Sequence, residues 1–174
     1  MEEIEVKILN VDRKKCEKIL LKIGAKKKFE GELITLAFDT KDKKLKLDNK
    51  IFRLRKEGDN QVLCLKEPIS KEGFKRMNET EVSVSDFEKI SEILKKIGFE
   101  IFAKTTKKRV SYKLDNTVFD FDKYTNEYEF IPEFLEIESN NVKSIEEYAK
   151  LLGYKKEDML PWGFQDLLKN YKSK

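Results

Sequence analysis

Charged side chains recur at every second position in several short segments of the chain. The segment "EEIEVKI", residues 2–8, spaces Glu3, Glu5 and Lys7 in this way, with apolar residues between them. In a β-strand the three charged side chains would share one face and the apolar ones the other. The charged face must then meet either bulk water or an interior that binds charged ligands.

Six further segments repeat this arrangement. Their charged positions are Arg53 and Arg55, Lys66, Glu79 and Glu81, Lys107 and Arg109, Asp120 and Asp122, and Glu136 and Glu138. One such strand is ordinary, but seven favour a barrel whose apolar face lies under helices and whose charges face the lumen. Buried charge is tolerated when it is paired or binds an ion. Opposite charges on neighbouring strands and a charged ligand would supply that compensation.

Three segments with helical periodicity separate the strands. Each starts at a capping residue and stops at a glycine, and their bounds are 12–24, 85–98 and 144–153, with Asp12, Ser85 and Ser144 as the caps. A last short helix is expected over 161–171. The strand-like segments after residues 2–8 are 28–40, 50–57, 61–67, 74–84, 99–113, 116–123 and 129–139.

This pattern predicts an α+β fold. Eight strands and few helices favour a mostly antiparallel eight-stranded β-barrel, or tunnel, with a charged lumen and helices packed on the outside. At 174 residues the chain is expected to form a single domain, 1–174. Cys16 and Cys64 lie in apolar segments and are expected to be buried free thiols.

Composition argues against several classes of function. Charged residues make up 40% of the chain, but the net charge is only +4, so a polybasic nucleic-acid or membrane binder is not expected. The absence of histidine excludes imidazole catalysis and histidine-ligated zinc. Neither a leader nor a run of about 20 apolar residues is apparent, so a cytoplasmic protein is expected.

The expected lumenal charges suit a polyphosphate together with a divalent cation. Cations from four strands would bind a chain of phosphates, and they are Lys7, Arg53, Arg55, Lys66, Lys107 and Arg109. Clustered carboxylates offer the oxygen ligands that Mg²⁺ or Mn²⁺ prefers, and Mg²⁺ is commonly shared with substrate phosphates. For any single pair a solvated face or a surface salt bridge is the commoner explanation. The combination favours a metal and polyphosphate site.

The motifs also resemble those of the CYTH superfamily, or triphosphate tunnel metalloenzymes, which includes class IV adenylyl cyclases, thiamine triphosphatases and inorganic triphosphatases. "EIEVK" is similar to the ExExK motif of that family. "FRLRK", "LCLKEP", "ETEV", "KKRVSY", "FDFDKY" and "FLEIE" follow in the family's order, over about residues 3–138. The resemblance implies an eight-stranded antiparallel tunnel.

The resemblance also implies roles for the motif residues. The metal ligands, for Mg²⁺ or Mn²⁺, would be Glu3, Glu5, Asp122, Glu136 and Glu138. The triphosphate would be bound by Lys7, Arg53, Arg55, Lys66, Lys107 and Arg109. The candidate catalytic residues are Lys7, Glu81 and Asp122. Glu81 would orient a base or a metal-bound water, and a lowered pKa would let Lys7 assist water activation.

Some positions stay open. The roles of Glu79, Asp120 and Trp162 are not assigned. Near the carboxyl end this chain reads "LPWGFQDLL" where many family members carry a Ser-Tyr pair. Trp162 and Phe164 could line one mouth of the tunnel, although packing of a terminal helix is the commoner role for such a pair.

Three functions fit the expected lumen. The first is a class IV adenylyl cyclase-like enzyme that converts ATP to cyclic AMP and pyrophosphate. The alternative is a triphosphatase acting on thiamine triphosphate, a nucleoside triphosphate or tripolyphosphate, and the second alternative is a non-catalytic polyphosphate- or nucleotide-binding module. The expected partner is a small-molecule triphosphate, without nucleic acid or membrane, and a homodimer is left open.

Overall fold

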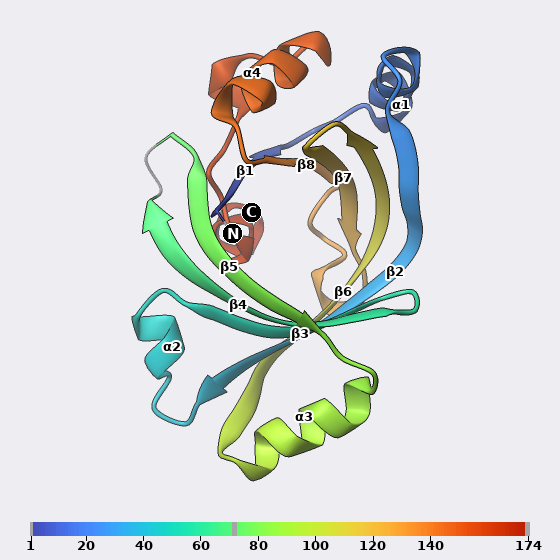
Figure 1. Cartoon of the computed structure of the whole chain (residues 1–174). Coiled ribbons are helices and arrows are strands. Elements are labelled where there is room, and N and C mark those ends of the chain that lie inside the picture. Colours follow the sequence, from blue (N-terminus) through green and yellow to red (C-terminus); the bar gives the residue numbers. More distant parts are fainter. Residues whose placement is uncertain (1, 71–72, 173–174) are drawn as a thin grey trace.

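Eight strands close into an antiparallel barrel (Figure 1). The computed structural model describes residues 2–70 and 73–172. The strands are β1 (Glu2–Ile8), β2 (Lys26–Thr40), β3 (Ile51–Glu57), β4 (Asn60–Ser70), β5 (Lys75–Ser83), β6 (Phe99–Leu114), β7 (Thr117–Tyr124) and β8 (Phe134–Ser139). Their order around the barrel is β1-β5-β4-β3-β2-β6-β7-β8, and β8 pairs back with β1. The predicted fold class is confirmed.

Helices lie outside this barrel. They are α1 (Arg13–Lys22), α2 (Lys44–Leu47), α3 (Phe87–Lys96), α4 (Val142–Leu151) and α5 (Phe164–Lys172), with 3-10 turns at Asn126–Tyr128 and Lys156–Asp158. In Figure 1, α1 and α4 lie at the top and α3 at the bottom. Within the described part of the chain, no helix is long and apolar enough to span a membrane.

Side-chain caps start the three long helices. Asp12 accepts a backbone hydrogen bond in the first turn of α1, as predicted. The predicted caps Ser85 and Ser144 are wrong, because the N-cap residues of α3 and α4 are Asp86 and Asn141. All four are good capping residues, so sequence preference alone does not separate neighbouring candidates. Strand β8 also begins later than predicted, at Phe134, because residues 129–133 form a turn and irregular backbone.

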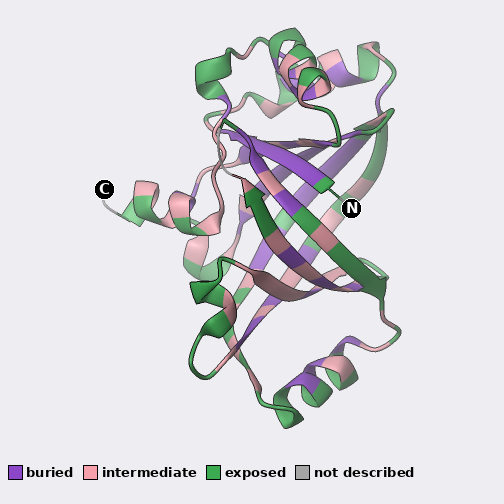
Figure 2. Cartoon of the chain, turned by 60° about the vertical axis from the view of Figure 1, so that its left-hand side comes forward, coloured by how far each residue is buried: buried purple, intermediate pink, exposed green. Residues whose placement is uncertain are grey.

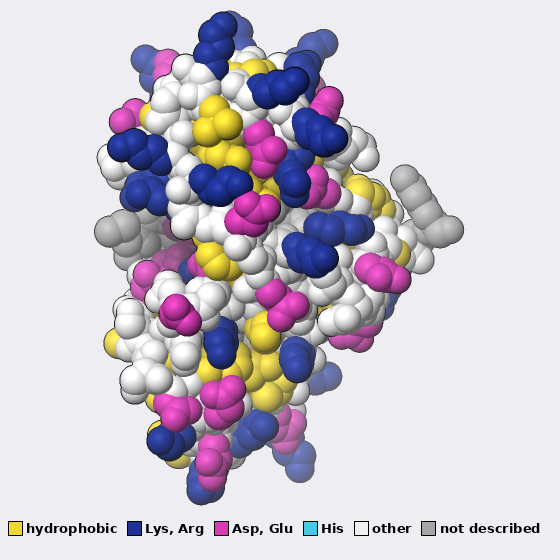
Figure 3. Space-filling view, turned by 90° about the vertical axis from the view of Figure 1, so that its right-hand side faces the viewer, with side chains coloured by type: hydrophobic (Ala, Val, Ile, Leu, Met, Phe, Trp, Pro, Cys, Tyr) yellow, Lys and Arg dark blue, Asp and Glu magenta, His cyan; other side chains and the backbone are white. Residues whose placement is uncertain are grey.

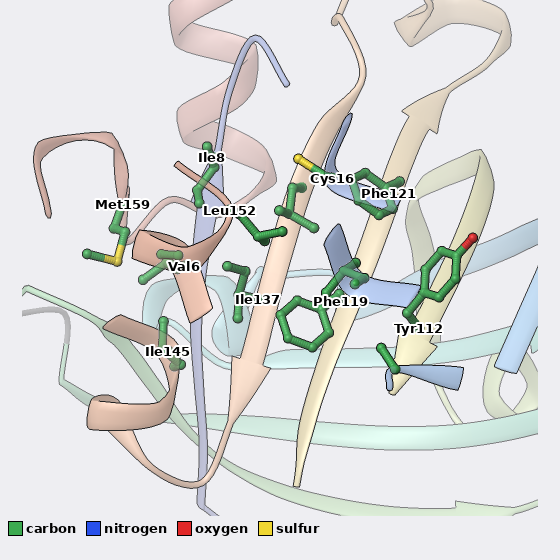
Figure 4. Packing of buried hydrophobic residues seen from close by; sticks show 14 of the residues in the cluster. Val6, Ile8, Cys16, Tyr112, Phe119, Phe121, Ile137, Ile145, Leu152 and Met159 are labelled. Carbon is green, nitrogen blue, oxygen red and sulfur yellow. The ribbon is translucent and has the colours of Figure 1, made fainter. Parts of the chain in front are cut away.

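The apolar faces of the strands point outward, beneath the helices. The largest core cluster joins β1, β6, β7 and β8 to α1 and α4. Figure 4 shows Val6, Ile137 and Phe119 from the strands packed beside Ile145 of α4. Figure 2 shows that buried residues follow the strands, while the helices keep exposed outer sides. Cys16 lies in this core and its thiol is free, as expected.

A second core cluster supports the opposite side of the barrel. Leu36 and Phe38 of β2 and Leu54 of β3 pack against Phe87 and Leu94 of α3. The outer surface carries charges of both signs, and the face in Figure 3 shows Lys and Arg interspersed with Asp and Glu. That face has no continuous basic stripe.

Candidate active site

A cavity of about 450 Å³ occupies the barrel lumen. Most of the predicted site residues line it, and they are Glu3, Glu5, Lys7, Arg53, Arg55, Lys66, Lys107, Arg109, Glu136 and Glu138. They come from β1, β3, β4, β6 and β8, because strand alternation turns every second side chain inward. The inward charged face inferred from the sequence is therefore correct for these strands.

Lys7 is a firmly charged residue of the lumen. Its Nζ lies 2.5 Å from a Glu136 oxygen and 3.0 Å from Glu5 Oε1. Burial favours the neutral amine, but the two carboxylates outweigh this effect and raise the pKa of Lys7. The predicted lowering of its pKa is therefore wrong. A protonated Lys7 is suited to binding a phosphate, and its catalytic role stays a prediction.

Arg109 connects three strands through acidic partners. Its Nε and Nη2 donate to the Asp122 carboxylate at 2.7 and 2.6 Å, and Nη2 also donates to Glu136 at 2.9 Å. Asp120 forms a further ion pair with Arg109. Asp122 also accepts from Lys107 Nζ at 2.5 Å and is fully buried. Asp122 does not line the cavity and here holds two cations, so its metal-binding and catalytic roles stay predictions.

A second ion network joins β1, β3, β4 and β5. Lys66 pairs with Glu3 and lies 3.1 Å from Glu79 Oε2. Arg53 Nη2 lies 3.4 Å from Glu79 Oε1, and Cys64 Sγ donates to the same oxygen at 2.7 Å. Glu79 therefore orients two lumenal cations. Arg53 Nε is buried and has no hydrogen-bond partner among the described residues, so a donor remains for a ligand.

Among the cavity-lining charges on the strands, two have no ion pair with any described residue: Arg55 and Glu138. The β1–β8 register places Glu138 opposite Glu5. Burial raises the pKa of Glu3 to about 9; Lys66 opposes this shift, and the charge of Glu138 adds to it. Carboxylates crowded in this way are suited to a hard cation, which would relieve their repulsion.

The acids are not already gathered as a metal cluster. Residues 2–70 and 73–172 contain no group of three or more acidic or thiol side chains placed to hold an ion. Lysines neutralise most of the lumenal acids instead, as Lys7 and Lys75 do for Glu5. The donor set still fits Mg²⁺ or Mn²⁺, because Glu3 and Glu138 offer oxygen ligands whose negative charges repel each other in the absence of a cation.

Lys75 is a lumenal residue that the sequence reasoning missed. Its Nζ lies 2.9 Å from Glu5 Oε1, and the residue lines the cavity. Burial lowers the pKa of Lys75; Glu5 opposes this shift, whereas Lys7 and Lys66 reinforce it. Extending the alternation of β5 back from Glu79 would have found it.

Glu81 lies apart from the other candidates. It is exposed, sits opposite Cys64 in the β4–β5 register and does not line the cavity. Its catalytic role stays a prediction. Glu79, two residues earlier on the same face, contacts the lumenal cations directly.

An apolar cluster bounds the lumen behind Lys107. Tyr124 and Phe134 continue the inward faces of β7 and β8 and pack with α5. The Nζ of Lys107 lies 5.4 Å from the centre of the Tyr124 ring. Trp162 and Phe164 pack on the same cluster, and Phe164 also lines the cavity. The terminal aromatic pair therefore packs a helix, and one member also borders the lumen.

The rim of the cavity includes residues that no motif indicated. From α2 and the turn after it come Lys46, Asn49 and Lys50, and from α5 come Gln165, Asp166 and Lys169. Figure 2 shows both helices on the same side of the barrel, at the left of the view. The "KLKL" segment of α2 alternates lysine and leucine but forms a helix, and α5 has no such alternation, so strand periodicity could not place either segment at the lumen.

Known proteins share both the sequence pattern and the fold. The model of the CYTH domain matches residues 1–163. A Methanocaldococcus jannaschii protein, provisionally named an adenylate cyclase, is 30% identical over 155 residues, which cover 87% of this chain and 84% of that protein.

Solved structures agree with this assignment. A Pyrococcus horikoshii protein has a TM-score of 0.77 and 28% identity, covering 95% of this chain and 98% of that one. A Hippeastrum protein, described as a candidate adenylyl cyclase with a dominant triphosphatase activity, has a TM-score of 0.61 and 16% identity, covering 87% of each chain. The second likeness concerns the fold alone. The family match and the charged tunnel lead to one conclusion: the chain belongs to the CYTH family.

Proposed function

We propose that this protein is a divalent-metal-dependent enzyme that binds a small-molecule triphosphate in the barrel lumen and cleaves a phosphoanhydride bond. One observation carries the proposal. Cations from five strands and acids from β1 and β8 converge on a single cavity. Phosphates would replace carboxylates as partners of the cations, and carboxylates would in turn be freed for a metal ion. This exchange keeps every buried charge compensated.

The lumenal residues have separate tasks in this reaction. Arg53 and Arg55 offer unpaired donors to phosphate oxygens, while Lys7 stays protonated beside them. Glu3 and Glu138 would hold Mg²⁺ or Mn²⁺, with help from Glu5. When bound, such an ion neutralises developing charge on the phosphates and lowers the pKa of a coordinated hydroxyl or water.

Class IV adenylyl cyclase activity is the first candidate. In that reaction the 3′-hydroxyl of ATP attacks the α-phosphorus, a new O3′–P bond forms, and the bond to pyrophosphate breaks. The hydroxyl proton passes to solvent or to a basic group. The M. jannaschii relative, 30% identical and provisionally named an adenylate cyclase, supports this choice.

A triphosphatase is the second candidate. Water then attacks the terminal phosphorus, and orthophosphate and a diphosphate leave. This reaction needs only bound metal, phosphate-binding cations and water, and the lumen offers the protein groups for all three. The activity described for the Hippeastrum protein belongs to a distant relative, and for this chain it supports the hydrolase only as an alternative.

Product analysis tests the proposal. The protein is incubated with Mg²⁺ or Mn²⁺ and, separately, with ATP, thiamine triphosphate or tripolyphosphate. Cyclic AMP with pyrophosphate establishes the cyclase, whereas orthophosphate without a cyclic product establishes the triphosphatase. If nothing turns over and tripolyphosphate still raises the melting temperature, the protein is a binding module and the enzymatic proposal is wrong.

A further inference from the structure

One part of the lumen wall carries no charge. The side chains of β2 that line the cavity are Leu33, Thr35 and Ala37. In the β2–β6 register, Thr35 faces Thr105 and Ala37 faces Ala103, and both partners also line the cavity. The four small residues Thr35, Ala37, Ala103 and Thr105 are called the neutral wall. They leave space inside the barrel where the other strands project long charged side chains.

The neutral wall begins beside the cations assigned to phosphate. In the β2–β3 register, Thr35 is the neighbour of Arg55, and Ala37 is the neighbour of Arg53. A triphosphate held by these two arginines would therefore have its next group directed along small, uncharged side chains. An inorganic phosphate chain would gain little there, since phosphate oxygens require donors or cations.

An aromatic side chain stands at the edge of the neutral wall. Ala37 faces Ala103 while Phe38 faces Ile101, so Phe102 is the extra residue of a β-bulge. Bulges re-aim side chains and are frequent beside active sites. Phe102 is 47% exposed and lines the cavity, whereas Ile101 packs into the core under α3. The ring of Phe102 is thus available for stacking.

The rim adds two amide side chains, Asn49 and Gln165. A four-residue helix such as α2 is not stable by itself. Buried Asp39 fixes it, because one carboxylate oxygen accepts from Leu45 N and the other from Lys46 N, both at 2.9 Å. The turn that carries Asn49 is therefore held at the mouth before any ligand binds.

We propose that the neutral wall binds the organic group of the triphosphate, and that this group contains a planar ring that stacks on Phe102. Ala37 and Ala103 leave the room for it, and the rim amides donate to or accept from its polar edge. This inference rests on the proposed function and deepens it. It selects an organic triphosphate over inorganic tripolyphosphate as the substrate class.

Two variants distinguish the binding of the organic group from the binding of the phosphates. Phe102→Ala removes the stacking surface, and Ala103→Leu fills the space in front of the wall. Lys104→Ala is the matched control, since Lys104 is an exposed neighbour on the outer face. Binding of ATP, thiamine triphosphate and tripolyphosphate in the presence of Mg²⁺ is measured by calorimetry for each protein, and turnover is measured alongside.

The wild-type protein should bind at least one of the two organic compounds. Phe102→Ala should then weaken that binding roughly tenfold, as expected for loss of one stacked ring. Ala103→Leu should weaken it more. Tripolyphosphate binding should change less than about twofold in both variants, as should every measurement on the control.

Three results would overturn the inference. The first is equal weakening of organic and inorganic compounds, which indicates a general structural defect. The second is organic-compound binding that both variants leave unchanged. The third is a wild-type protein that binds tripolyphosphate but neither organic compound, in which case the metal-dependent triphosphate function stands without this substrate class. A protein that binds none of the three compounds would overturn the proposed function as well.

Discussion

The charged side of the lumen and the neutral wall differ in how far their side chains must rearrange before a ligand can bind. On the charged side, formed by β1, β3, β4, β5, β6, β7 and β8, most acids and cations neutralise one another, so a ligand must exchange partners with them. The neutral wall has no such partners to exchange and is preformed. Substitutions on the charged side should therefore affect chemistry and stability together, whereas those on the neutral wall should affect ligand choice.

The largest effect should come from the acids assigned to the metal. Glu3→Gln and Glu138→Gln keep the shape of each side chain but remove the ionisable group. Each should lower turnover at least about a hundredfold, because positioned charge supplies much of the stabilisation of the transition state. Circular dichroism should show an intact fold.

Glu2→Gln is the control, since Glu2 is exposed and pairs with Arg76 outside the lumen. Full activity in both lumenal variants would refute the assignment of Glu3 and Glu138 to the metal.

A paired and an unpaired arginine of the lumen, Arg109 and Arg55, should separate stability from binding. Arg109→Leu leaves the fully buried Asp122 with one of its two cations and should lower the free energy of unfolding by about 3–5 kcal/mol. Arg55→Leu breaks no ion pair with a described residue and should change that energy by no more than about 0.5 kcal/mol. Urea unfolding measures both.

Arg55→Leu should affect the binding of tripolyphosphate even though it leaves stability almost unchanged. Arg55→Leu should weaken it roughly tenfold in calorimetry, as expected for loss of a charge-assisted hydrogen bond. If Arg55→Leu destabilises the fold as much as Arg109→Leu, the distinction between paired and unpaired lumenal cations is wrong.

The pKa of Glu3 predicts how stability depends on pH in protein freed of metal with EDTA. The folded state keeps the proton of Glu3 up to about pH 9, whereas the unfolded chain releases it near the ordinary pKa of 4.5. The folded state binds more protons in this window, so the free energy of unfolding should fall as the pH rises through it. The raised pKa of Asp120, about 7, adds to the decline below pH 7.

Glu3→Gln should flatten this decline between about pH 4.5 and 9, most visibly above pH 7, where Asp120 no longer contributes. Glu5 acts in the opposite direction, because its lowered pKa contributes stability above about 4.5 that is lost only as the pH falls below that value. Urea unfolding at several pH values compares the two proteins. Equal slopes above pH 7 would contradict a protonated Glu3 in the folded state.

The smallest effect on ligand binding should come from the anchor of α2. Asp39→Asn replaces a buried carboxylate that accepts from three backbone N–H groups with an amide that has one acceptor oxygen. We expect a loss of about 1–2 kcal/mol in the free energy of unfolding, and a KM for an organic triphosphate that rises more than kcat falls. Asp42→Asn, on the exposed turn, is the control. A change in kcat alone would show that α2 has no part in binding.

Local alternation made the barrel and most of the site predictable. The period of two determines which side of a strand faces the lumen, and it correctly assigned Glu3, Arg53 and Glu138 to the cavity without knowledge of their neighbours. The glycine stops and the polar caps likewise marked the helices, with errors of a few residues at Ser85 and Ser144.

Pairing between strands could not be read in the same way. The charge state of Lys7 depends on Glu136, more than a hundred residues away in sequence, and that contact raises its pKa instead of lowering it. The bulge that turns Phe102 toward the cavity is likewise a property of the β2–β6 register. α2 and α5 reach the rim only because the barrel closes.

The sequence by itself therefore determined which face of each strand is inward, the ionic character of the lumen and the family to which the motifs belong. The tertiary structure alone decided which acid neutralises which cation, which charges stay unpaired and where the lumen becomes neutral. The physical reason is the separation in sequence between the interacting groups. Side-chain alternation is set by each strand's own backbone, whereas pKa values and free space depend on groups brought together by closure of the barrel.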